Sequence, residues 1–436
     1  MLYHIHEFNR ALLSPATYLA HVGASMFSTP GGWLSQVPGA ARIAAGCELM
    51  FRMGKDYPKP AFGIRELSVR GGSVAVLERT VVNKPFCRLQ CFERSSADAA
   101  VQERLGQDPI VLLVAPLSGH HATLLRDTVR ALLADHQVYI TDWVDARLVP
   151  RAEGAFTLDD YVGYVREFMQ HLGTERVNVI SVCQPCVPVL AAAALQAAAG
   201  RPVPRTLTMM GGPIDARCHP TRVNDLATNH SLKWFEDHVL HEVPAKYPGG
   251  GRRVYPGFLQ HAGFIAMNPG RHVGSHWDFY GHLVEGDLED AAAHRRFYDE
   301  YNAVLDLPAE YYMDCIRIVF KEYLLPRGLW YVGGERVAPE ALESTALLTI
   351  EGELDDISGI GQTRAAHDLC SGIPKALKHH LMVAGAGHYG IFSGRRWRES
   401  VYPRVRDFIA TAGALALDEV VPLSSPPRSR ESQLAR

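Results

Sequence analysis

The pattern of apolar and polar positions changes near residue 109. Before that point, three segments alternate apolar with polar residues, as expected for a half-exposed sheet: 64–69, 74–80 and 86–93. After it, short continuous apolar runs alternate with helix-like segments; the runs are PIVLLVAP, QVYITDW, RVNVISV and TLTMMGG. Such runs are typical of a buried parallel sheet with crossover helices. The pattern therefore predicts an α/β fold with a mainly parallel sheet.

The strand rhythm stops after Pro213 and resumes near residue 345 with TALLTIEGE and, later, LKHHLMVAGAGH. The stretch between is rich in aromatic, histidine and charged residues, which favours a mainly helical insertion that lids the core. We predict five parts: 1–62, an apolar helical N-terminal segment; 63–215, the first part of the core; 216–343, the helical cap; 344–412, the second part of the core; and 413–436, a tail rich in Pro, Ser and Arg that is expected to be disordered.

Residues 11–41 contain no Asp, Glu, Lys or Arg. Their prolines and glycines predict that one membrane-spanning helix does not form there. One interpretation is a segment packed on the core. The other is an apolar surface that adsorbs to a hydrophobic particle.

Composition and charge narrow the class of protein. The 436 residues are 47% hydrophobic and 21% charged, which is typical of a folded globular chain. The formal net charge is −3, so no nucleic-acid partner is predicted. No run of about eighteen apolar residues, the length of a membrane-spanning helix, occurs. The start MLYHIHEFNR does not resemble a secretion signal, and eight scattered cysteines do not form a disulfide framework, so a cytoplasmic location is expected.

The most informative stretch is VNVISVCQPCVPVLAAAALQ, residues 178–197. It predicts a strand ending at Val182, a sharp turn and a helix, which is the context of a nucleophile elbow. Cys183 occupies the turn, where the start of a helix favours a thiolate. Ser181 and Pro185 stand where the usual elbow has glycines. A simpler interpretation makes Cys183 a small buried hydrophobic residue.

A cysteine nucleophile needs a base and an orienting acid, which in α/β-hydrolases follow later in the chain, acid first. Asp355 follows one predicted strand, and His388 lies in a small-residue loop after the next. The order Cys183, Asp355, His388 is the expected one. Asp215, which also follows a strand, is an alternative acid.

The same fold predicts where an oxyanion would be stabilised. One backbone N–H should come from Gln184, immediately after the nucleophile. The second should come from Leu117 or Ser118, in the loop after the first buried strand of the parallel series.

Other chemistry has weaker signals. Cys183 and Cys186 form a C-x-x-C pair that also marks thiol-disulfide oxidoreductases. No further Cys or His pair has the spacing of a structural zinc site, and no nucleotide-binding glycine motif is present. Neither a metal nor an organic cofactor is predicted.

Several longer stretches closely resemble the intracellular poly(3-hydroxybutyrate) depolymerases of bacteria. They are APLSGHHATLLRDTV, VISVCQPCVPVLAA, TMMGGPIDAR, VYPGFLQHAGFIAMNP, AHRRFYDEYNAVLDLPAEYY, EGELDDISG and GHYGIFSGRRWRE. The resemblance covers nearly the whole chain except the tail, and extends more distantly to the polyhydroxyalkanoate synthases.

This resemblance implies an α/β-hydrolase fold and a cytoplasmic enzyme, associated with storage granules, that cleaves the polyester to 3-hydroxybutyrate oligomers and monomer. By motif, Cys183 matches the family's nucleophile, Asp355 its acid and His388 its base. Three alternatives stay open. The acyl group could be transferred to coenzyme A, whose phosphates would lie near Arg252, Arg253, Arg395 and Arg396. The protein could also be a synthase-like acyltransferase or a non-enzymatic granule coat. Whether the chain forms a homo-oligomer also stays open.

Overall fold

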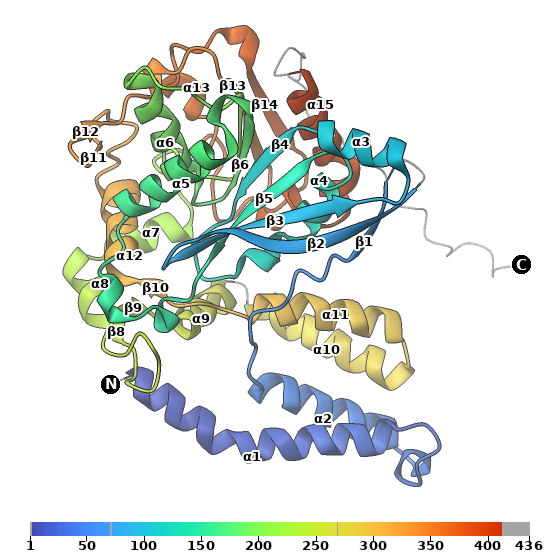
Figure 1. Cartoon of the computed structure of the whole chain (residues 1–436). Coiled ribbons are helices and arrows are strands. Elements are labelled where there is room, and N and C mark those ends of the chain that lie inside the picture. The colour runs from blue at the N-terminus through green and yellow to red at the C-terminus, as the bar shows by residue number, and fades with distance from the viewer. Residues whose placement is uncertain (1, 70–71, 268, 412–436) are drawn as a thin grey trace, which may run out of the picture.

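The computed structural model describes residues 2–69, 72–267 and 269–411 (Figure 1). Within them, nine strands form one sheet in the order β1-β2-β3-β5-β4-β6-β7-β13-β14. The strands are β1 (Glu66–Val69), β2 (Gly72–Asn83), β3 (Cys87–Ser95), β4 (Ile110–Val114), β5 (Gln137–Trp143), β6 (Val177–Val182), β7 (Thr206–Met210), β13 (Ala346–Gly352) and β14 (Lys378–Val383).

The direction of the strands changes along the sheet. The first three strands pair antiparallel with each other, and β3 pairs antiparallel with β5. From β5 to β14 every neighbouring pair is parallel. The α/β fold with a mainly parallel sheet that the apolar runs predict is therefore confirmed, and this order of strands is that of an α/β-hydrolase.

Both faces of the parallel part are covered by helices, which explains its continuous apolar runs. All six residues of β6 are buried. Its Val179 faces a core formed with α5 (Leu158–Leu172) and α6 (Cys186–Ala198). Its Ile180 faces the opposite core, formed with α4 (Arg126–Leu132) and α15 (Tyr402–Thr411), because successive strand residues point to opposite faces.

Residues 216–343, called the cap below, lie between β7 and β13 in the sequence. Their helices are α7 (Arg222–Asn229), α8 (Leu232–His238), α9 (Gly257–Met267), α10 (Pro269–Glu285), α11 (Leu288–Tyr301), α12 (Ala309–Asp314) and a π-helix (Cys315–Lys321). Short strands β8 (His241–Glu242), β9 (Arg253–Tyr255) and β10 (Leu307–Pro308) form a separate small sheet. The predicted domain boundaries stay predictions, and the predicted tail, 413–436, lies outside the described residues.

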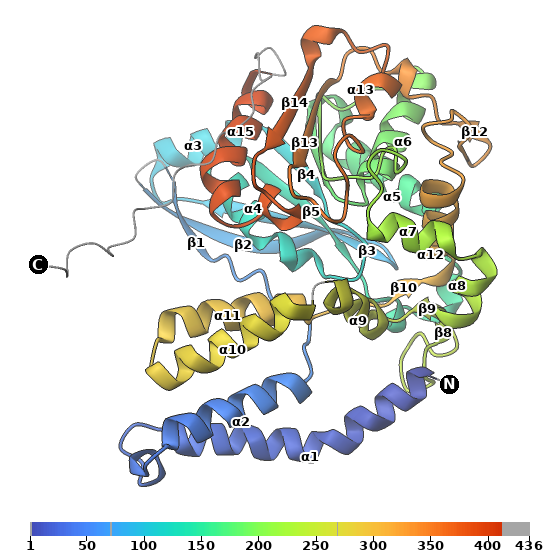
Figure 2. The same cartoon turned by 180° about the vertical axis from the view of Figure 1, so that it is seen from behind.

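The N-terminal segment forms a helical hairpin of α1 (Leu2–Ser28) and α2 (Ala40–Gly54), which lies beyond α10 and α11 (Figures 1 and 2). Helix α1 ends before Pro30, but it passes through Pro15 without a break. A proline removes one helical hydrogen bond, and here the packing of α1 along α2 supports the turns on either side. In the described residues, no helix combines the length and apolarity needed to cross a bilayer.

Candidate active site

Cys183 lies in the turn between β6 and α6, at the carboxyl edge of the parallel sheet. Its φ is +68°, in the left-handed region that a side chain with a Cβ rarely adopts. The Cys183 N–H donates to the carbonyl of Met210 (2.7 Å), and the Cys183 carbonyl accepts from the N–H of Cys186 (3.1 Å). These bonds hold the strained turn, which is the geometry of a nucleophile elbow. Ser181 and Pro185 do not prevent it.

His388 and Asp355 form a buried pair next to this turn. His388 Nδ1 lies 2.8 Å from Asp355 Oδ2, and the Asp355 side chain is fully buried. The other carboxylate oxygen, Oδ1, accepts the backbone N–H groups of Ile357 and Ser358, both at 2.9 Å. The carboxylate is thus fixed by three hydrogen bonds, and His388 is oriented by it.

The alternative acid, Asp215, is engaged elsewhere. Its two carboxylate oxygens accept hydrogen bonds from Nε and a terminal nitrogen of Arg217, at 2.8 and 2.7 Å. The structure brings Asp355, and not Asp215, to His388.

The charges around His388 favour its protonated form. Burial alone would lower its pKa, but the charges of Cys183 and Asp355, and side-chain hydrogen bonds to both, raise the pKa well above 6.5. Since Nδ1 is bonded to Asp355, Nε2 is the nitrogen left for the sulfur. The imidazole of His388 thus interacts with both Cys183 and Asp355.

Backbone N–H groups are free where the sequence predicts an oxyanion hole. Among the backbone hydrogen bonds of the described residues, none is donated by Gln184, Leu117 or Ser118. The loop that carries the last two is held by neighbouring Gly119 and His120. The Gly119 carbonyl accepts from Leu305 of the cap (2.8 Å), and the His120 side chain bonds the carbonyl of Tyr301 (3.1 Å).

Comparison with known protein families gives a match in the second part of the chain. Residues 211–413 match the family model described as PHB de-polymerase C-terminus. The matched range covers a little under half of the 436 residues. The match includes Asp355 and His388, whereas Cys183 lies before it. No curated protein matches the chain.

Solved structures similar to this chain include several hydrolases. A 2-hydroxy-6-oxo-6-phenylhexa-2,4-dienoate hydrolase from Rhodococcus sp. strain RHA1 is 14% identical, with a TM-score of 0.42 over 77% of this chain and 99% of that one. The carboxylesterase CesB from Bacillus subtilis is 12% identical, with a TM-score of 0.39 over 77% and 92%. A monoacylglycerol lipase from Paleococcus ferrophilus is 13% identical, with a TM-score of 0.40 over 70% and 96%.

Gly211, the first residue of the range that matches the family model, contributes to the site in a way that sequence reasoning missed. It has φ +57°, and a Cβ there would lie 3.2 Å from His388 Cε1 and 3.3 Å from Asp355 Oδ2. The glycine leaves room for the pair. The only signal in the sequence is its place at the end of a predicted strand, which many glycines share.

Two other thiols lie close to the elbow. Cys186 is buried against Ser181, and Cys315 of the cap accepts a hydrogen bond from the Gln184 side chain (3.6 Å). Burial raises the pKa of each to about 12. Cys183 and Cys186 are both free, and a buried thiol with a raised pKa does not suit a redox pair. The contact of Cys315 with Gln184, which ties the cap to the elbow, was not predicted.

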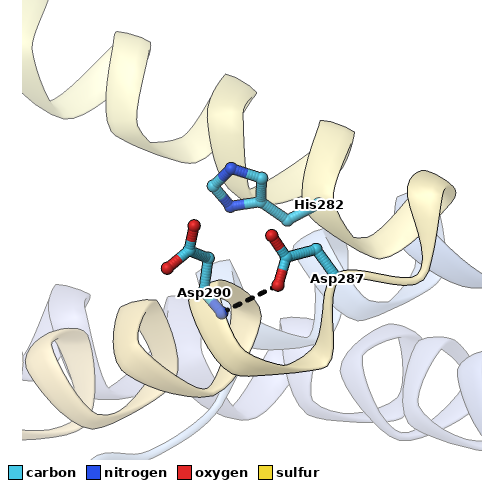
Figure 3. Close-up of side chains that lie close together, drawn as sticks. All are labelled: His282, Asp287 and Asp290. Carbon is cyan, nitrogen blue, oxygen red and sulfur yellow. Dashed lines mark hydrogen bonds between the residues drawn. The ribbon is translucent and has the colours of Figure 1, made fainter. Parts of the chain in front are cut away.

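In the described ranges, one group of side chains has the spacing of a metal site (Figure 3). Ligand atoms of His282, Asp287 and Asp290 lie within 4.8 Å of one another at the turn between α10 and α11. Asp287 already caps α11 by accepting the N–H of Asp290 (3.1 Å), and both carboxylates are exposed. The group lies away from the elbow and contains none of the candidate catalytic residues.

A cavity of about 790 Å³ lies between the N-terminal hairpin and the cap, lined among others by Tyr3, Met53, Phe258, Trp277 and Asp306. Cys183 and His388 do not line it. It is therefore separate from the candidate active site.

Proposed function

We propose that the protein is an intracellular depolymerase that hydrolyses the ester bonds of amorphous poly(3-hydroxybutyrate), releasing 3-hydroxybutyrate oligomers and monomer. The observation that carries this proposal is the position of Cys183 in a left-handed turn beside the buried His388–Asp355 pair. The match of residues 211–413 to the PHB de-polymerase C-terminus model supports the choice of polyester as substrate. The substrate would be met at cytoplasmic granules, without a nucleic-acid partner.

In the first half of the reaction, Cys183 gives its proton to His388 and the thiolate attacks the ester carbonyl. The resulting oxyanion accepts the N–H groups of Gln184 and of Leu117 or Ser118, each donor being worth roughly 3 kcal/mol in comparable sites. The carbon–oxygen bond then breaks, and His388 protonates the departing alkoxide. An acyl thioester on Cys183 remains.

In the second half, water replaces the alcohol. His388 takes a proton from a water molecule, which attacks the thioester carbonyl, and the Cys183 thiolate leaves as the free acid forms. Asp355 keeps the imidazole in the tautomer whose Nε2 faces the reacting atoms, and it stabilises the imidazolium. No metal or organic cofactor is needed for any step.

The cap is proposed to form the wall over the polyester chain. Phe264 of α9 stacks on His120, directly behind the proposed oxyanion loop, with ring centroids 5.0 Å apart. Aromatic side chains of this kind suit an uncharged, largely apolar chain.

Acyl transfer to coenzyme A is the second candidate, and the structure weakens it. Arg252 is buried, and its guanidinium donates to the carbonyls of Val149, Pro150 and Gly154. Arg395 pairs with Glu399 at 3.8 Å. The guanidinium of Arg252 is thus engaged within the fold, which does not favour a role for it at the phosphates of coenzyme A.

The deciding experiment incubates amorphous poly(3-hydroxybutyrate) particles with the wild type and with Cys183→Ala, with and without coenzyme A. Hydrolysis predicts release of free 3-hydroxybutyrate by the wild type alone, independent of coenzyme A. Equal release by the two proteins would reject Cys183 as nucleophile. Products that appear only as coenzyme A thioesters would favour the transferase, and no release at all would favour a coat protein.

A further inference from the structure

The outer face of helix α1 is apolar and open to solvent. Five large side chains on it are between 47% and 69% exposed: Ile5, Phe8, Leu12, Leu19 and Met26. They are separated by three, four, seven and seven residues, so they form one stripe along a helix of 27 residues, about 40 Å long. We call these five residues the α1 stripe. A helix face that meets only water normally carries polar residues.

The inner face of α1 already has its partners. The buried residues of the helix, Tyr3, Ala20 and Ala24, lie on the side opposite the stripe. Tyr3 donates to Asp306 of the cap (2.7 Å), and α1 also packs along α2. The stripe is therefore not needed to hold α1 in place.

Helix α2 fixes the hairpin to the cap. Its exposed Ile43 and Met50 lie on one side of the helix. Arg52, on the other side, is buried and pairs with Asp299 at 2.8 Å. Glu48 pairs with Arg295 at 3.1 Å. The ionic contacts of α2 thus point toward α11, and Figure 2 shows the hairpin beyond that helix, with α1 outermost.

The absence of charge identifies the kind of partner. From Ala11 to Ala41 the sequence contains no Asp, Glu, Lys or Arg. Helices that bind anionic membranes carry Lys and Arg on their polar face, and specific protein interfaces have a polar rim that sets register. The stretch that holds Leu12, Leu19 and Met26 has neither property. Such a surface suits an uncharged apolar phase, which requires no fixed register.

We propose that the α1 stripe adsorbs the protein to an uncharged hydrophobic particle of ester polymer and holds the cap side of the molecule against it. The identity of the particle rests on the proposed function. The adsorption itself rests on the exposed stripe and does not depend on the chemistry at Cys183.

The test measures binding without hydrolysis, using full-length protein that carries Cys183→Ala. The stripe variant adds Phe8→Ser, Leu12→Ser and Leu19→Ser. The matched control adds Leu77→Ser, Leu226→Ser and Leu288→Ser, three leucines that are 63%, 49% and 72% exposed and lie outside the hairpin. Each protein is sedimented with amorphous poly(3-hydroxybutyrate) particles, with neutral phosphatidylcholine vesicles and with anionic phosphatidylglycerol vesicles. Circular dichroism and sedimentation velocity check folding and oligomeric state.

We expect the stripe variant to lose at least about tenfold in partition to the polyester particles, because three exposed apolar side chains no longer leave water. The control should bind as the parent does. Equal binding of the stripe variant and the parent would overturn the proposal. So would binding to anionic vesicles alone, or a parent dimer that the stripe substitutions dissociate without changing particle binding.

Failure of the docking proposal can be distinguished from failure of the proposed function. A parallel set with Cys183 intact is assayed on a soluble 3-hydroxybutyrate ester, on which the stripe variant and control should be equally active. If neither set hydrolyses any ester but stripe-dependent adsorption persists, the function fails and the docking surface stands. If soluble ester is hydrolysed and the stripe variant still adsorbs normally, the docking proposal is rejected and the proposed function stands.

Discussion

Replacing Asp355 by asparagine tests the arrangement of the site most directly. Asp355 Oδ1 accepts two backbone N–H groups, from Ile357 and Ser358. In Asp355→Asn the amide oxygen must stay at that position, because an NH2 group there would face two donors. The NH2 group then points at His388 Nδ1, which has to accept. The imidazole proton moves to Nε2, and the base can no longer take a proton from Cys183.

The expected loss is large, while the fold should change little. Holding the imidazole in the wrong tautomer lowers kcat about 10⁴-fold, which is equivalent to about 5 kcal/mol of transition-state stabilisation. The assay is kcat/KM on a soluble 3-hydroxybutyrate ester, with circular dichroism to confirm folding. Asp215→Asn is the matched control, since Asp215 pairs with Arg217 and should keep nearly full activity.

Two results would refute this reasoning. One is an Asp355→Asn enzyme within about tenfold of the wild type, because an oriented imidazole would then be unnecessary. The other is an equal loss in Asp215→Asn, which would make Asp215 the acid.

Three further predictions concern the neighbours of the site and the core. Cys186→Ala should retain hydrolytic kcat/KM within a few-fold of the wild-type value, since that thiol is buried and its pKa is raised to about 12. Loss of activity would instead support a redox pair of Cys183 and Cys186. Because the folded pKa of His388 is raised above 6.5, its contribution to stability is fully present below pH 6.5 and disappears as pH rises through the folded pKa. The difference in urea midpoint between wild type and His388→Gln should therefore be largest below pH 6.5 and shrink as the pH is raised above it, and a constant difference would contradict the assignment. Asp108→Ala leaves the buried Arg94 unpaired and should cost about 3–5 kcal/mol of unfolding free energy in urea, whereas Glu93→Ala, which breaks the exposed pair with Arg79, should cost under about 1 kcal/mol; similar costs would be unexpected.

Local pattern was sufficient to predict the sheet and the order of the candidate residues. Continuous apolar runs predict strands that are buried on both faces, and Cys183 and Asp355 come shortly after two such strands. His388 comes after β14, whose residues alternate between buried and half-buried. Because the carboxyl ends of parallel strands share one edge, residues far apart in the chain could be expected to meet there.

Contacts between distant segments could not be predicted in this way. Nothing near Arg252 indicates that three carbonyls on the loop 149–154 would surround its guanidinium. The exposed α1 stripe could not be predicted either, because the apolar content of residues 11–41 does not show which face of a helix is covered. That depends on Tyr3 reaching Asp306, some three hundred residues later.

The backbone at Cys183 also limits which other nucleophile the site could use. At a φ of +68°, a second heavy atom on the Cβ would crowd the adjacent peptide groups. Serine has the same single branch as cysteine and fits the turn, so a Cys183→Ser protein should fold and expose an oxygen at the same place. Threonine would have to unwind the turn, which moves its hydroxyl away from His388. Among the hydroxyl and thiol side chains, the geometry thus admits the two unbranched ones.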